Sequence, residues 1–224
     1  CWHCGLKGRS FIWLLKLAGA SNPNQYKNIF QETKQINLED IDLIFGKEEV
    51  RKNKLTLPKS YENLFKNLEK AFYKPAVEYL LKRGLKKEDI LKYDIHYSVS
   101  DQRVLFPSYD REHNLNYYVA RSIQPFENYK YKNATASKRE VIFNEHLIDW
   151  EKPLYVVEGI FDAILSRKNA VPILGSNVGS GSLLFKRLLQ NNTEVVIALD
   201  ADAKKKMFKM INELVKYNIP VTYV

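Results

Sequence analysis

The sequence has 224 residues, of which 45% are hydrophobic and 12% aromatic, and this excludes a disordered chain. No apolar run is long enough to cross a bilayer and no signal peptide opens the chain, so we expect a cytoplasmic protein (the host cytoplasm if a phage encodes it) with no membrane partner. The net charge of +9 favours nucleic acid as a partner, because cations set against phosphates release bound counterions.

The first 60 residues carry one chemical motif, Cys1-x-x-Cys4, which holds both cysteines of the chain. Zn²⁺ in a structural site takes four ligands, so these two cysteines form at most half of a site. A redox-active or chance pair is the alternative. Helices are predicted next, at Phe11–Leu17, Gln25–Thr33 and Leu38–Phe45. The charged segment Gly46–Ser60 lacks periodicity and is predicted to be a linker. We treat 21–60 as a helical connector.

The segment 61–153 is predicted to form an α+β unit. Helices come first, at Tyr61–Tyr73, Ala76–Arg83 and Lys86–Tyr93. Strands follow at Ile95–Val99, Arg103–Ser108 and Leu115–Ile123, and the last two flank a hairpin-like turn. Pro125–Lys138 is polar, basic and aromatic without periodicity, which predicts a loop over a site.

From residue 154 onward, strands and helices alternate. The predicted strands are Leu154–Val157, Pro172–Leu174, Glu194–Leu199 and Pro220–Val224, and the helices between them are Phe161–Arg167, Ser182–Leu189 and Lys204–Tyr217. This alternation indicates a parallel sheet with helices on its faces. The fold class is therefore α/β: an α+β unit followed by a parallel α/β sheet over 154–224.

Acidic residues follow two of these strands. Glu158 and Asp162 come after the first strand, and Asp200 and Asp202 come after the strand near residue 199. Parallel strands end at the same edge of a sheet, and ligands bind at that edge. The spacing of Asp200 and Asp202 predicts that both side chains lie on one side of an extended strand end. Gathered carboxylates repel one another, and Mg²⁺ or Mn²⁺ removes that cost and can bridge phosphate oxygens. The alternative is that these acids serve as turns and helix caps.

The two acidic motifs resemble a known domain. Glu158-Gly159, Asp200-x-Asp202 and the turn Leu174-Gly175-Ser176 resemble the Toprim domain shared by primases, topoisomerases and some nucleases. Upstream segments are similar, in order, to bacterial and phage-type (DnaG-like) DNA primases; they are Ala76–Tyr97, Arg103–Pro107, Tyr118–Arg121, Lys130–Asn133 and Ser137–Asn144. The resemblance covers about 76–224.

This resemblance implies a DNA primase, a DNA-directed RNA polymerase that synthesises short RNA primers on single-stranded DNA from ribonucleoside triphosphates during replication. A replicative helicase, separate or fused, is the expected partner. The resemblance also makes 1–20 the remnant of a zinc ribbon, with Cys1 and Cys4 as a partial Zn²⁺ site, and 154–224 a truncated Toprim part. Implied roles are Mg²⁺ or Mn²⁺ binding by Glu158, Asp162, Asp200 and Asp202, and nucleotide or nucleic-acid binding by Arg103, Arg121, Lys130 and Lys138.

Two alternatives stay open at this point. The first is another Toprim enzyme, a topoisomerase or a nuclease, and the primase-like segments before residue 150 weigh against it. The second is a non-catalytic nucleic-acid-binding module in which the acidic motifs only shape turns.

Overall fold

The computed structural model describes residues 55–175 and 178–224. They form two compact units, one made of 55–137 and 141–147 and the other of 138–140 and 148–224. The predicted zinc half-site and the helices before residue 46 lie outside the described residues. Within the described ranges, every helix is too short or too polar to span a membrane.

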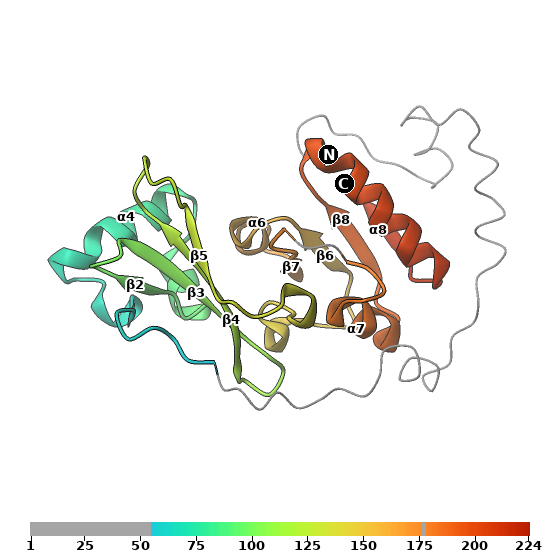
Figure 1. The fold of residues 1–224 in the computed structure, drawn as a ribbon, viewed down its shortest axis with the longest axis horizontal. Coiled ribbons are helices and arrows are strands. Elements are labelled where there is room, and N and C mark those ends of the chain that lie inside the picture. Colours follow the sequence, from blue (N-terminus) through green and yellow to red (C-terminus); the bar gives the residue numbers. More distant parts are fainter. Residues whose placement is uncertain (1–54, 176–177) are drawn as a thin grey trace. The chain divides into compact units, whose positions relative to one another are not determined.

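The unit that contains 55–137 is built on an antiparallel sheet with the strand order β1-β2-β3-β4-β5. Its strands are β1 (Glu62–Asn63), β2 (His96–Ser98), β3 (Arg103–Tyr109), β4 (Leu115–Ser122) and β5 (Tyr131–Asn133). Its helices are α4 (Lys74–Lys82) and α5 (Lys87–Lys92), with short 3₁₀ turns η2 (Phe65–Asn67), η3 (Ala71–Tyr73) and η5 (Glu145–Leu147). Figure 1 shows this sheet with α4 beside it.

Most predicted elements of this unit are confirmed. Pro75 lies in the first turn of α4, and Gly84 takes a left-handed conformation (φ 92°) just after the helix, as a helix end requires. The turn between β3 and β4 closes with a hydrogen bond from the Asp110 N–H to the Asn114 carbonyl at 2.9 Å. The segment predicted as a loop over 125–138 contains a short strand, β5, which pairs with β4.

The helix predicted over Tyr61–Tyr73 is wrong. Glu62 and Asn63 pair with β2 at the sheet edge, and the rest of the segment forms two 3₁₀ turns. The Asn63 side chain accepts the Lys66 N–H at 3.0 Å, which offers the backbone an alternative to helical bonds. The expected apolar face also fails, since Leu64 is buried but Phe72 is 76% exposed.

Asp94 fastens the strands of this unit to one another. Its carboxylate accepts hydrogen bonds from the Tyr109 hydroxyl and the Asn63 amide, both at 2.6 Å, and His96 Nε2 lies 3.3 Å away. These three partners belong to β3, β1 and β2. Burial works to raise the pKa of Asp94, but the hydrogen bonds from His96, Tyr109 and Asn63 outweigh it and lower the pKa below its ordinary value.

The other unit has a parallel sheet with the strand order β7-β6-β8-β9. The strands are β6 (Leu154–Val157), β7 (Ala170–Pro172), β8 (Val195–Ala198) and β9 (Val221–Tyr223), and the connecting elements are α6 (Ile160–Leu165), α7 (Leu183–Asn191), η6 (Ala201–Ala203) and α8 (Lys204–Lys216). The turn η4 (Lys138–Glu140) belongs to this unit as well.

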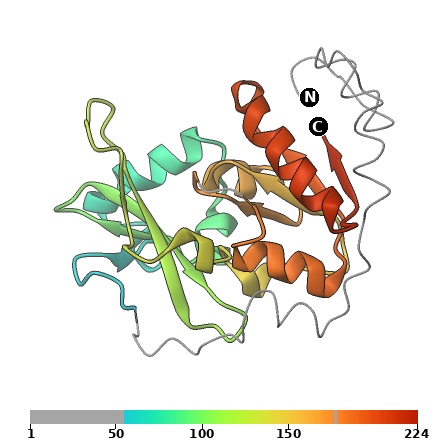
Figure 2. The same cartoon turned by 45° about the vertical axis from the view of Figure 1, so that its right-hand side comes forward.

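Right-handed crossovers decide which face each helix covers. The chain moves from β6 outward to β7, and then back across β6 to β8 and on to β9, so α6 lies on one face and α7 and α8 on the other (Figures 1 and 2). The Phe185 ring of α7 meets the Tyr217 ring at the end of α8, with 5.1 Å between centroids. Leu154, Val195 and Leu214 are fully buried between these layers. The predicted parallel α/β sheet after an α+β unit is thus confirmed.

Asp94 allows a test of how this unit is held together. Asp94 has φ 46°, a conformation that Asn tolerates and Ala does not, so Asp94→Asn removes the charge while leaving the backbone unstrained. We expect Asp94→Asn to lower the free energy of unfolding by about 1–2 kcal/mol, and Asp94→Ala to lower it by about 1 kcal/mol more, in urea titrations at pH 7.

The pH dependence of this effect has a defined sign. The folded-state pKa of Asp94 is lowered, so stabilisation by the carboxylate is complete above the pKa of the unfolded chain and is lost as the pH falls through the folded pKa. The difference between wild type and Asp94→Asn should therefore shrink below about pH 4. A difference that stays constant down to pH 2 would contradict this account.

Candidate active site

The order of the parallel strands creates one distinguished place in the sheet. The chain leaves β6 toward β7 on one side and reaches β8 on the other, so the carboxyl ends of β6 and β8 flank the point where the strand order reverses. Val157 pairs with Ala198 at that end. Helices leave this point on opposite faces, and in open parallel sheets ligands bind beyond the strand ends at such a point.

Glu158 and Asp162 lie at this point, as predicted. Glu158 directly follows β6 and is partly exposed, whereas Asp162 lies in the first turn of α6 and is exposed. The Asp162 Oδ2 atom accepts the Gly159 N–H at 2.9 Å and so caps α6. A Cβ atom at Gly159 would approach the same oxygen to 3.0 Å, and glycine therefore leaves room for the cap. The capping role considered from the sequence is present at Asp162.

Asp200 and Asp202 follow β8 on the same edge of the sheet, and both are exposed. Their expected arrangement on one side of an extended strand end is wrong. The chain turns into η6 immediately after Asp200, and the Ala203 N–H donates to the Asp200 carbonyl at 2.9 Å. Asp202 lies within this turn, and α8 begins two residues after it. In the described ranges, no three His, Cys, Asp or Glu side chains form a group that could hold a metal ion.

A basic side chain, Lys138, is held at the same edge. Its ammonium donates a hydrogen bond to the Leu174 carbonyl at 2.7 Å, and it lies 3.9 Å from the position of a Cβ atom on Gly175. The turn after β7 is unusual, since Leu174 (φ 51°) and Gly175 (φ 81°) are both left-handed. The Leu174 N–H donates to the Glu158 carbonyl at 3.1 Å, which ties this turn to the end of β6.

Lys206 is a second cation at this edge and was not predicted from the sequence. It lies in the first turn of α8 and is partly buried. Burial lowers the pKa of Lys206 and nearby Lys138 lowers it further, while Glu158 acts in the opposite direction. The signal in the sequence was the run of three lysines that opens this helix, with no acidic residue in its first turn. Cations there oppose the helix dipole, and an anionic ligand would offset that repulsion.

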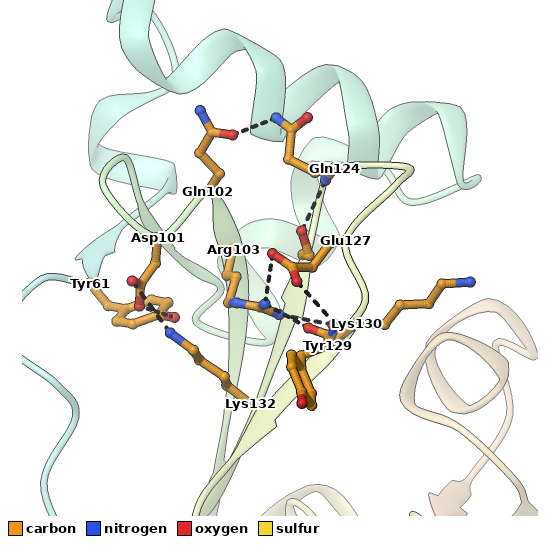
Figure 3. A network of polar contacts seen from close by, with 10 residues as sticks. Tyr61, Asp101, Gln102, Arg103, Gln124, Glu127, Tyr129, Lys130 and Lys132 are labelled. Carbon is orange, nitrogen blue, oxygen red and sulfur yellow. Dashed lines mark hydrogen bonds and ion pairs between the residues drawn. The ribbon is translucent and has the colours of Figure 1, made fainter.

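The residues predicted to bind nucleic acid in the other unit have different surroundings. Arg103 is 2% exposed, and its guanidinium donates to the main-chain carbonyls of Tyr129 at 2.6 Å and Lys130 at 3.0 Å. It also lies 3.5 Å from the carboxylate of Glu127. Figure 3 shows these contacts converging on Arg103 from the loop that joins β4 to β5. In this structure Arg103 holds the loop in place, and the predicted grip on phosphates stays untested.

Arg121 and Lys130 differ in how far their charges are engaged. The Arg121 Nε atom donates to the Tyr79 hydroxyl at 2.8 Å, and its guanidinium stacks on the Tyr131 ring, 4.9 Å from the centroid. Arg121 therefore joins α4 to β5. Lys130 is exposed, and its side chain extends away from the Arg103 network in Figure 3.

No family model matches the chain. The uncharacterized protein MG010 of Mycoplasma genitalium is 29% identical over 129 residues, which cover 54% of this chain. The match spans 59% of the length of that relative.

Solved structures show a clearer likeness. A DnaG catalytic core superposes with a TM-score of 0.58 at 17% identity, covering 87% of this chain and 71% of that one. The Aquifex aeolicus primase, with its zinc-binding and RNA polymerase domains, gives 0.55 at 19% identity, covering 100% of this chain and 66% of that one. A DnaG primase catalytic domain bound to single-stranded DNA gives 0.54 at 17% identity, covering 86% and 70%. The chain therefore has the fold of DnaG primase catalytic cores, and at these identities the likeness concerns the fold.

The network around Arg103 can be tested directly. Arg103→Lys keeps the charge, but one ammonium cannot reproduce the two parallel bonds to the carbonyls of residues 129 and 130. We expect a loss of about 1–3 kcal/mol in the free energy of unfolding and faster hydrogen exchange over 122–131. Arg111→Lys is the matched control, because the Arg111 side chain is 56% exposed and its guanidinium lies 3.5 Å from the carboxylate of the adjacent Glu112. Equal exchange in wild type and Arg103→Lys would contradict the holding role.

Proposed function

We propose that this chain is part of a DNA primase and contributes the catalytic core that joins ribonucleotides on a single-stranded DNA template. The observation that carries the proposal is the set of acidic and basic side chains at the β6–β8 edge, within a fold shared with DnaG primase catalytic cores. A ligand with both phosphates and a divalent cation matches this mixture of charges. The net charge of +9 and the DNA-bound state of one structural neighbour support a nucleic-acid template.

The basic side chains suit the triphosphate of the incoming nucleotide. An ammonium has three N–H donors, so Lys138 can hold a phosphate oxygen while it keeps its bond to the Leu174 carbonyl. That bond fixes the position of the charge before the ligand arrives. Lys206 enters from α8, where the N-terminal amides of the helix add positive potential. In the reaction the primer 3′ hydroxyl gives its proton to solvent as its oxygen bonds to the α-phosphorus, and the bond from that phosphorus to the bridging oxygen breaks to release pyrophosphate. The two lysines would offset the charge on this leaving group.

The acidic side chains have the chemistry of an Mg²⁺ or Mn²⁺ site. Glu158 and Asp200 leave neighbouring parallel strands at the same edge, and carboxylate oxygens are the ligands that these ions prefer. Glu158, Asp200 and Asp202 would hold the ion, with Asp162 contributing the oxygen that does not cap α6, and nucleotide phosphates would complete the ligand set. When bound, such an ion offsets the charge that develops on the phosphate oxygens during transfer.

A second candidate is a nucleic-acid-binding module without catalysis. It is favoured by one observation, that the described acidic side chains do not gather into a group able to hold a metal ion. The melting temperature in increasing Mg²⁺ or Mn²⁺, with and without a ribonucleoside triphosphate, separates the candidates. A primase core should be stabilised by the metal together with the nucleotide, and a module of the second kind by neither.

The acidic edge is tested by removing its exposed members. Asp200→Ala with Asp202→Ala should reduce ribonucleotide incorporation on single-stranded DNA by at least about a hundredfold, because several kcal/mol of charge stabilisation are lost. The melting temperature should not fall, since both side chains are exposed. Glu194→Ala is the control, because Glu194 is an exposed acidic residue that directly precedes β8, at the end of that strand opposite to Asp200. Full activity of the double variant would refute the proposed function.

Asp162 needs a variant that separates its two roles. Asp162→Asn keeps an oxygen that can accept the Gly159 N–H, so the cap and the melting temperature should be preserved. Activity should fall if the carboxylate charge helps to bind the metal ion. Unchanged activity would leave Asp162 with the capping role alone.

The basic side chains give a test with two readouts of opposite sign. Lys206→Met should raise KM for ribonucleoside triphosphates by about tenfold, the size expected for one charge-assisted hydrogen bond. The same substitution removes a partly buried cation from the start of α8, so the melting temperature should stay equal or rise. Lys209→Met, at an exposed position on the same helix, is the control. A lower melting temperature with unchanged KM would make Lys206 a structural residue.

A further inference from the structure

The loop between β4 and β5 exposes aromatic rings to an unusual degree. Phe126 is 94% exposed and Tyr129 is 78% exposed, and Tyr131, the first residue of β5, is 47% exposed. Isolated exposed rings are common on protein surfaces, but three within six residues concentrate exposed aromatic area in one short segment, as interaction surfaces do. We define residues 123–130 as the aromatic loop.

The backbone of the aromatic loop is fastened at several points. The Ser122 N–H donates to the Lys130 carbonyl at 2.9 Å and the Ile123 N–H to the Gln102 carbonyl at 3.0 Å, which close the loop at its base. Farther out, the Tyr129 N–H donates to the Glu127 carboxylate at 3.0 Å, and Arg103 holds the carbonyls of Tyr129 and Lys130. The contacts of Arg103 and Glu127 are drawn in Figure 3. A loop ordered in advance loses little entropy when a ligand arrives.

The charges around the exposed rings favour an anionic ligand. Glu127 is the acidic residue of the aromatic loop, and Arg103 neutralises it at 3.5 Å. The exposed Lys130 has no ion pair among the described residues, and Lys132 on β5 is 60% exposed beside Asp101. Exposed rings and lysine side chains on an ordered loop match a ligand made of unpaired bases joined by phosphates. A duplex fits poorly, because its base faces are already stacked.

We propose that the aromatic loop is a stacking platform for unpaired bases, in which Phe126 and Tyr129 contact base faces and Lys130 contacts a phosphate. The identity of the strand as the DNA template rests on the proposed function. The interaction itself depends only on the loop, so it can be measured without nucleotides or metal.

The experiment measures binding of the full chain to a fluorescein-labelled oligothymidylate of about 16 nucleotides by fluorescence anisotropy, across a range of salt concentrations. Phe126→Ala with Tyr129→Ala should weaken binding by about tenfold or more at every salt concentration, because stacking is uncharged. Lys130→Ala should instead lower the slope of log K against log salt by about 0.7, the value for one phosphate contact on a single strand. Phe72→Ala is the matched control, since Phe72 is 76% exposed outside the loop.

The outcomes separate this inference from the proposed function. Wild-type affinity in the Phe126, Tyr129 double variant overturns the platform, even if primer synthesis is intact, and would favour a protein partner for these rings. Equal loss of affinity for the oligothymidylate and for a blunt duplex overturns it as well. A third outcome is that the rings are needed for binding to the oligothymidylate, but the complete wild-type protein incorporates no ribonucleotide. That result would overturn the primase proposal and leave the stacking platform supported.

Discussion

The candidate active site depends on the reversal of strand order between β6 and β8. The two strands are buried and apolar, and they pair in parallel up to Val157 and Ala198. Main-chain hydrogen bonds continue past the last strand pairs, since the Ile173 and Leu174 N–H groups donate to the carbonyls of Val157 and Glu158. Each charged group at the edge is placed by this framework: Glu158 by β6, the acceptor of Lys138 by the turn after β7, and Lys206 by the helix that follows β8.

The sequence predicted the strands and helices whose hydrophobic residues follow a clear period. The strand Leu154–Val157 and the alternation after it were predicted correctly, because buried strands and amphipathic helices leave a strong pattern. The second strand was placed two residues too late, at Pro172–Leu174, whereas it spans Ala170–Pro172. The segment 61–73 was misassigned, since its apolar spacing is helical while the open edge of β2 and the Asn63 side chain favour a strand and turns. Tertiary pairing of this kind leaves no local signal.

The site was predicted in part for similar reasons. Strand direction, which the alternation reveals, predicted that Glu158, Asp162, Asp200 and Asp202 follow the carboxyl ends of β6 and β8. The cap on α6, the turn at η6 and the burial of Arg103 depend on the last few ångströms of side-chain placement, which residue spacing does not determine. Lys206 was detectable from three consecutive lysines at a helix start, but an exposed charged face gives the same pattern.

Several features of the chain work against stability in places where ligands are proposed. Cations lie at the positive end of α8, Leu174 adopts a left-handed conformation without being glycine, and the aromatic loop leaves rings in water. Local violations of otherwise consistent structure gather at functional sites, because selection there acts on binding. The Asp94 carboxylate, by contrast, accepts hydrogen bonds from both Asn63 and Tyr109.

The lysines that open α8 also bear on how the protein is handled. A cationic helix start beside Lys138 attracts any small multivalent anion, and it does not distinguish a nucleotide from an inorganic ion. Sulfate or phosphate in a purification buffer would therefore raise the apparent thermal stability by mass action, and under the proposed function it would compete with the nucleotide for the same charges. Under that function, the buffer in which this protein is most stable would be the one in which it is least active.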